Sequence, residues 1–164
     1  MRSGGSTANR NGHILEDALI PCFTRNNYHI YNSYNDFLAA KKDGTLPKKY
    51  VVKQVPFTTI YNKKGKTEFV VVNKLSHITV RIECKWQQAA GSVDEKFPYM
   101  YLNAVFGYPE DHVIFCVGGN GYKPEALAWL KNACNKKYFY PENCNKCIEV
   151  MELSEVIQTI NSLR

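Results

Sequence analysis

Residues 78–87 read Ile78-Thr-Val-Arg-Ile-Glu-Cys-Lys-Trp-Gln87, and this stretch decides the fold. In a β-strand, successive side chains point to opposite faces. One face then carries four residues that can pack in a core: Val80, Ile82, Cys84 and Trp86. The opposite face carries polar or charged residues that are costly to bury without a purpose: Arg81, Glu83, Lys85 and Gln87. The pattern predicts a strand with one apolar face that packs in the core and one polar face that is available for binding or catalysis.

The segments before this strand predict an antiparallel meander. Residues 49–61 and 67–72 are rich in Val, Tyr, Phe, Thr and Ile, which favour strands. Residues 62–65 form a turn signal between them, and residues 73–77 turn into the strand at residue 78.

Helical signals stand on both sides of the meander. Residues 6–20 predict an amphipathic helix with Ser6 or Thr7 as N-cap, which Pro21 ends or kinks. Its expected buried stripe is Ile14, Leu15, Ala18 and Leu19. In residues 92–106, Ser92 with Glu95 is a capping-box pattern and predicts another helix.

The other elements follow from short patterns. We expect a strand at 28–31, a helix at 35–42, a strand buried on both faces at 112–117, a flexible Gly-rich loop at 118–121, a helix at 124–134, a strand at 148–151 and a last helix capped by Ser154. A helix between two strands implies a parallel crossover. The order predicts an α/β (α+β) fold, a mixed β-sheet flanked by helices on both sides. Residues 1–164 are expected to form a single domain, with a flexible N-terminus over about 1–5.

The charge of the chain is uneven. The chain has a formal net charge of +6, and residues 1–66 contain eleven Lys/Arg but only four Asp/Glu. Most of these cations are lysines: Lys41, Lys42, Lys48, Lys49, Lys53, Lys63, Lys64 and Lys66. Such a segment can neutralise phosphates, or it can be an ordinary solvated surface. No apolar window is long enough to span a membrane, and the polar N-terminus has no signal-peptide core, so a cytoplasmic location is expected.

The polar face of this strand is suited to metal-assisted hydrolysis. Two carboxylates, Glu68 and Glu83, would lie near one another if the two strands form a hairpin, and no other Asp or Glu occurs between Lys48 and Arg81. Together with the backbone carbonyl of Cys84 they would offer the oxygen ligands that Mg²⁺ prefers. Lys85 would assist the attacking water or stabilise the phosphorane, and Gln87 would orient the water or a phosphate.

Glu68, fourteen intervening residues and Glu83-x-Lys85 resemble the PD-(D/E)xK nucleases, the restriction-endonuclease-like superfamily. Residues 9–16, where a Gly precedes a helical Glu, and residues 83–96 resemble parts of phage and bacterial restriction-type nucleases. The resemblance covers roughly residues 6–120 and implies the family's αβββαβ core. It also implies a Mg²⁺- or Mn²⁺-dependent endodeoxyribonuclease that leaves 5′-phosphate and 3′-hydroxyl ends.

The resemblance implies further roles. Glu16 would hold a second metal ion or its water, and the protein would bind DNA, without a membrane, in a bacterial or phage-infected cell. A homodimer is expected because a small chain cannot easily surround a duplex and cut both of its strands. The expected DNA-binding residues are Lys48, Lys49, Lys53, Lys63, Lys64, Lys66 and Lys96. The family usually has Asp at the first carboxylate position, where this chain has Glu68. Two alternatives stay open: a resolvase of Holliday junctions or other branched DNA, and a catalytically inactive module that binds nucleic acid or protein.

The cysteines predict little beyond packing. Cys84 and Cys116 lie in apolar runs and are expected to be buried thiols. Three C-terminal cysteines could supply zinc ligands: Cys134, Cys144 and Cys147. A fourth ligand would have to come from a distant residue such as His112, so a structural zinc is not expected. The four histidines show no metal-binding spacing and are expected to be structural or surface residues: His13, His29, His77 and His112.

Overall fold

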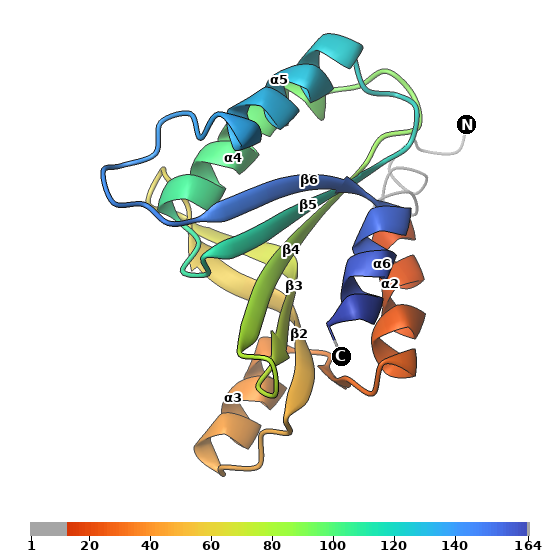
Figure 1. The fold of residues 1–164 in the computed structure, drawn as a ribbon, viewed down its shortest axis with the longest axis vertical. Helices are drawn as coiled ribbons and strands as arrows, with labels where there is room; N and C mark the ends of the chain where they lie inside the picture. The colour runs from red at the N-terminus through yellow and green to blue at the C-terminus, as the bar shows by residue number, and fades with distance from the viewer. Residues whose placement is uncertain (1–12, 164) are drawn as a thin grey trace, which may run out of the picture.

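A computed structural model describes residues 13–163, so the predicted flexible N-terminus and the predicted cap at Ser6 or Thr7 lie outside the described residues. A six-stranded sheet is the centre of the fold (Figure 1). Its strands are β1 (His29–Tyr31), β2 (Lys49–Thr58), β3 (Lys64–Asn73), β4 (Ile78–Trp86), β5 (His112–Gly118) and β6 (Cys147–Glu152). The helices are α2 (Ile14–Arg25), α3 (Tyr34–Lys42), α4 (Phe97–Phe106), α5 (Pro124–Asn135) and α6 (Leu153–Ser162), with a short 3₁₀ turn η1 (Asp94–Lys96) before α4.

The strands lie side by side in the order in which they occur in the chain. β2, β3 and β4 form the predicted antiparallel meander, whereas β1 pairs with β2, β5 with β4 and β6 with β5 in parallel. The parallel pairs are those with a helix in the connection, because a parallel return needs a crossover of a dozen or more residues. The mixed α/β sheet of the prediction is confirmed, and α2, β2–β4, α4 and β5 supply its αβββαβ core.

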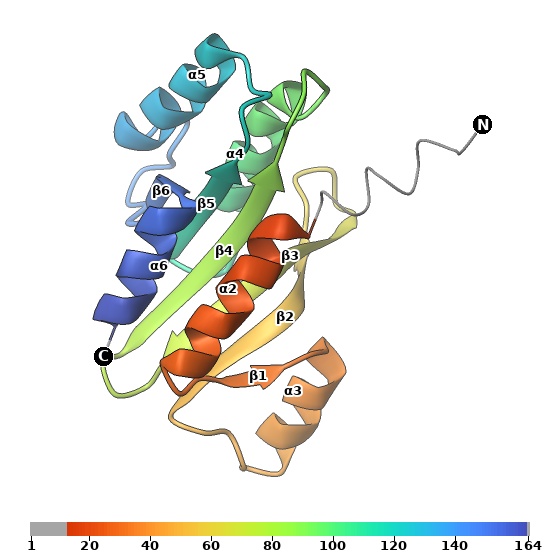
Figure 2. The same ribbon diagram turned by 90° about the vertical axis from the view of Figure 1, so that its right-hand side faces the viewer.

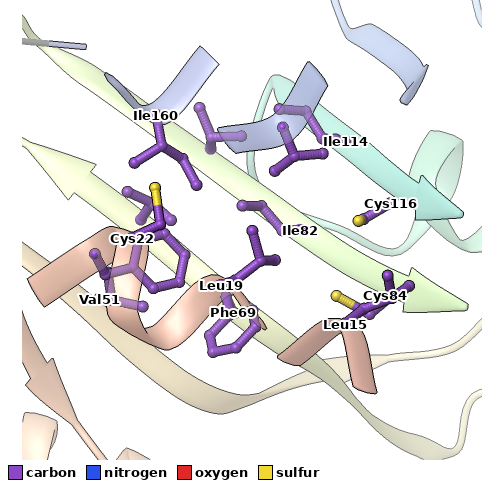
Figure 3. Packing of buried hydrophobic residues seen from close by; sticks show 14 of the residues in the cluster. Leu15, Leu19, Cys22, Val51, Phe69, Ile82, Cys84, Ile114, Cys116 and Ile160 are labelled. Carbon is purple, nitrogen blue, oxygen red and sulfur yellow. The ribbon is translucent and has the colours of Figure 1, made fainter. Parts of the chain in front are cut away.

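Helices cover both faces of the sheet. α2 and α6 lie side by side over one face (Figures 1 and 2), and α4 and α5 pack together over the other. Figure 3 shows Leu15 and Leu19 of α2 over Ile82 and Cys84 of β4. Burial on both faces makes β4 a central strand, and its C-terminal end carries the predicted site residues Glu83 and Lys85.

α2 differs from the predicted helix at its end. Pro21 does not end the helix, which continues to Arg25 with Pro21 inside it. Pro21 is exposed, so the carbonyl that loses its intrahelical partner can bond water. Cys22 and Phe23 are buried in the core, and this packing holds the last turn in place. Ile14 was expected in the buried stripe, but it is 37 % exposed.

Two predicted helix caps are wrong. No side-chain cap occurs at the start of α4, because residues 94–96 form the turn η1 and Lys96 is the N-cap. α6 begins one residue before Ser154, and its capping box is formed by Glu152 and Glu155 instead. The strand at 112–117 is confirmed as β5, buried on both faces, and Cys84 and Cys116 are confirmed as buried thiols. Within residues 13–163, no helix is long and apolar enough to cross a membrane.

Candidate active site

The site begins where β3 and β4 separate. Their last paired residues are Phe69 and Ile82. Beyond this point the Glu68 carboxylate takes the place of the backbone partner, because its Oε2 accepts a hydrogen bond of 2.8 Å from the N–H of Cys84. The end of the ladder therefore brings a carboxylate from β3 against the backbone of β4, as the hairpin prediction requires.

Three oxygens converge at the ammonium of Lys85. Its Nζ lies 2.5 Å from Oε1 of Glu83, 3.0 Å from the carbonyl oxygen of Cys84 and 4.0 Å from Oε1 of Glu68. These are the oxygens that the sequence assigned to a metal ion. The Lys85 side chain is only 23 % exposed, so the cluster sits in a shielded environment where charge interactions are strong.

Two tyrosines complete the surroundings of this cluster, and neither was predicted. The hydroxyl of Tyr108 donates to Oε2 of Glu83 at 3.0 Å, so both oxygens of Glu83 have partners. The hydroxyl of Tyr122 donates to the backbone carbonyl of Lys85. Tyr108 is itself fixed by the buried guanidinium of Arg81, which lies 4.9 Å from the centre of its ring. These contacts hold the Glu83 carboxylate in one orientation.

The two carboxylates influence each other and Lys85. Burial, and then the nearby Glu83 charge, raise the pKa of Glu68 from 4.5 to about 7. Burial alone would lower the pKa of Lys85, but Glu83 and Glu68 outweigh it, so the pKa of Lys85 lies above its ordinary value. Lys85 therefore stays protonated. The Glu68 carboxyl would ionise more readily if a further positive charge lay beside it.

A cleft of about 270 Å³ opens beside Glu83 and Lys85. Four exposed lysines line it: Lys63, Lys64, Lys66 and Lys96. These predicted DNA-binding residues come from the β2–β3 turn, the start of β3 and η1, and they line the same cleft as Glu83 and Lys85 of β4. A cation-rich cleft with Glu83 and Lys85 in its wall is suited to an anionic substrate.

Three other predicted lysines are placed elsewhere. Lys49 begins β2 and pairs with Asn73, which pairs with Ile78 at the opposite end of β4 from Lys85. Lys48 directly precedes it. Lys49 and Thr58 stand at the two ends of the ten-residue strand β2, a distance of about 30 Å. Lys53 lies midway along β2. The structure therefore divides the lysine-rich segment into a group at the cleft and a group away from it.

Gln87 is buried, and its amide is fully engaged by the backbone. Its Nε2 donates to the carbonyl of Gly121 at 2.7 Å, and its Oε1 accepts from the N–H of Val93 at 2.9 Å. The Gly118–Gly121 loop was predicted to be flexible, but these contacts hold it in place. Two backbone hydrogen bonds add to them: the N–H of Gln87 donates to the carbonyl of Gly118, and the N–H of Gly121 donates to the carbonyl of Gln87. Gly119 has φ +91° and passes so close to the Gln87 carbonyl that no side chain would fit. Gln87 positions the loops next to the site.

Glu16 is buried near the start of α2. Within residues 13–163, the hydrogen-bond partner found for its carboxylate is the imidazole of His13, 3.1 Å away. Its neighbour Leu15 packs in the same core cluster as Cys84. The helix is thus placed against the strand of the site, but the structure gives no contact between Glu16 and Glu68 or Glu83 among the described residues.

The comparison with known protein families decides the identity of the fold. A family model described as a PD-(D/E)XK nuclease superfamily domain matches residues 7–163. The chain belongs to the PD-(D/E)XK nuclease superfamily. Searches of curated proteins and of solved structures gave no match. Membership makes a nuclease the enzyme class and implies that the domain binds nucleic acid; nucleases of this superfamily generally use divalent metal ions.

The donor set of this PD-(D/E)XK site fits such an ion. Glu68, Glu83 and the Cys84 carbonyl offer hard oxygen atoms, which suit Mg²⁺ or Mn²⁺ rather than zinc. These three oxygen donors already surround one positive charge, the Lys85 ammonium. Burial, and then the Glu83 charge, raise the pKa of Glu68, and a second positive charge beside this carboxylate would offset both effects.

Proposed function

We propose that this PD-(D/E)XK protein is a Mg²⁺- or Mn²⁺-dependent endodeoxyribonuclease. The observation that carries the proposal is the convergence of the Glu83, Cys84 and Glu68 oxygens around the Lys85 ammonium. The product ends would be a 5′-phosphate and a 3′-hydroxyl.

Glu68, Glu83 and the carbonyl of Cys84 would hold the metal ion. When bound, the ion lowers the pKa of the attacking water and polarises the phosphate. Lys85 keeps its proton and donates from Nζ to the negative charge that develops on the phosphate. Tyr108 keeps the Glu83 carboxylate in orientation through its hydrogen bond. A role of Glu16 in holding a second ion stays a prediction.

The lysine cleft supports a nucleic-acid substrate. Lys63, Lys64, Lys66 and Lys96 would contact backbone phosphates, which position a strand without reading its sequence. A phosphate held by these lysines would lie beside Glu83 and Lys85, which line the same cleft. We infer that a homodimer is the form that cuts both strands, since each chain offers one such site.

A second candidate function is cleavage of branched DNA. The ring of Tyr61 is 69 % exposed and stacks on Tyr99, which lines the cleft, with ring centres 5.1 Å apart. An exposed aromatic pair beside a cationic cleft is a surface on which an unpaired base can stack. This favours substrates with unpaired nucleotides near the cut, such as junctions and flaps.

The test is cleavage of supercoiled plasmid, linear duplex and a four-way junction, with Mg²⁺, Mn²⁺ or EDTA. Wild type is compared with Lys85→Ala, Glu83→Ala and the exposed control Lys131→Ala on α5. We expect cleavage in both metals, its loss in EDTA and in the first two variants, and its retention in the control. Junction-only nicking would favour the second candidate.

Cleavage that persists in EDTA, or in both active-site variants, would refute the site. Binding of DNA without cleavage in either metal would instead favour the inactive binding module.

A further inference from the structure

A second cluster of metal-binding side chains lies at the other end of the sheet. The imidazole of His112, the thiol of Cys147 and the carboxylate of Glu149 offer ligand atoms that all lie within 4.8 Å of one another. The imidazole Nε2 and Glu149 Oε2 are 2.7 Å apart. None of these three residues takes part in the nuclease site.

Strand pairing explains how residues 35 and 37 positions away from His112 reach it. β5 and β6 are parallel, with His112 directly opposite Cys147 and Ile114 opposite Glu149. Paired residues of neighbouring strands point to the same face, and so do residues two apart on one strand. The three side chains therefore project together because of the backbone register.

This cluster is separate from the site of Glu83 and Lys85. His112 is level with Val80 on β4, five residues or about 16 Å along the strand from Lys85. The side chains also project from opposite faces of the sheet. Glu83 is level with Phe115 in the core under α4 and α5, whereas Glu149 is level with Ile114 in the core under α2 and α6.

We propose that His112, Cys147 and Glu149 bind one Zn²⁺-class transition-metal ion, with a fourth position open to water. A thiolate, an imidazole and a carboxylate form a ligand set typical of zinc and unsuited to Mg²⁺. Ligand atoms of a tetrahedral zinc site lie about 3.3–3.8 Å apart, so small side-chain rotations of these three residues suffice. Their partial exposure gives the ion a path of entry.

The cluster is not the set of cysteines that the sequence suggested. Cys134 is buried in the core under α4 and α5, and neither it nor Cys144 belongs to the group formed by His112, Cys147 and Glu149. The bound ion would join the first residues of β6, the edge strand, to β5. The ion would thereby fix the start of β6, where the loop after α5 enters the sheet.

The test uses the full chain, stripped of metal, with Zn²⁺ or Co²⁺ alone. We expect one Zn²⁺ per chain in competition with a chromogenic chelator, a rise in the melting temperature, and a thiolate-to-cobalt charge-transfer band with Co²⁺. Cys147→Ser should abolish the band. His112→Ala and Glu149→Ala should weaken binding at least about tenfold, since even indirect supports of a metal site are worth that much.

Two controls locate the ion. Glu83→Gln should leave Zn²⁺ binding unchanged, which separates this site from the nuclease site. Cys144→Ser, three positions from Cys147, should retain the band and the affinity. The proposal is overturned if wild type binds no stoichiometric Zn²⁺, if Cys147→Ser binds as tightly as wild type, or if Cys144→Ser loses binding as Cys147→Ser does.

Discussion

Replacing Glu68 by Gln should stabilise the metal-free protein at high pH. Burial and the Glu83 charge raise the pKa of Glu68 from 4.5 to about 7. Between these two values the folded protein holds a proton that the unfolded chain has released, so its stability falls as the pH rises. This rise in the pKa of Glu68 corresponds to a loss of on the order of 3 kcal/mol in the free energy of unfolding, which is complete above about pH 7. The amide introduced by Glu68→Gln has no proton to lose and avoids the penalty.

The assay is urea unfolding in EDTA at half-unit steps from about pH 4.5 to about pH 8, which brackets the two pKa values. The free energy of unfolding of Glu68→Gln, minus that of wild type, should rise by on the order of 3 kcal/mol across this range. Taking the difference cancels titrations that the two proteins share. Mg²⁺ added at the upper end of the range should stabilise wild type more than the variant, because only wild type keeps both carboxylates.

An exposed acid supplies the control. It is the same charge removal at an exposed position, Glu95→Gln in η1. A pH-independent difference for Glu68→Gln, or one that falls as the pH rises, would refute the description of Glu68 as a buried carboxylate whose charge is disfavoured by its neighbour.

Three further outcomes are expected. Tyr108→Phe should weaken Mg²⁺-supported cleavage by roughly five- to tenfold in single-turnover kinetics, because Glu83 loses a hydrogen bond of about 1 kcal/mol; an unchanged rate would contradict its positioning role. Gln87→Ala should lower the free energy of unfolding by about 1–3 kcal/mol, because two half-buried backbone groups lose the partner that the buried Gln87 amide provides, and a loss below about 0.5 kcal/mol would contradict this. Lys64→Ala should flatten the slope of log affinity for duplex DNA against log salt by about 0.9, whereas Lys48→Ala should change it less; equal effects would contradict the division of the lysines.

Local patterns predicted most of the fold. The alternation of residues 78–87 located β4, and the β-rich segments before it located the rest of the meander. Such periodicity is a property of neighbouring residues, so one sequence is enough to detect it. The end of α2 could not be predicted in this way. Pro21 is a local signal to stop, and the burial of Cys22 and Phe23 that overrides it depends on the rest of the core.

The site residues also differ in whether local sequence patterns could predict their contacts. Glu68, Glu83 and Lys85 come together because they lie on adjacent strands of one hairpin, whose register follows from a short turn. Tyr108 lies 25 residues from Glu83 and reaches it only through the helix and the crossover that follow β4. No spacing in the sequence predicts that contact.

Distance along the strands explains the remaining differences. Lys49 and Lys64 look like members of one cationic segment, but β2 carries them to opposite ends of the sheet. Conversely, His112 and Cys147 lie 35 positions apart in the sequence, and the pairing of β5 with β6 makes them neighbours. Placing such residues requires the register of the whole sheet.

The central claim is that Lys85 and the carboxylates around it cut phosphodiester bonds. The most direct test is the single-turnover rate of DNA cleavage in Mg²⁺ for Lys85→Met, beside wild type and the exposed control Lys131→Met. We expect a loss of about 10²–10³-fold for Lys85→Met and a rate near wild type for the control. A Lys85→Met rate within about threefold of wild type would contradict it.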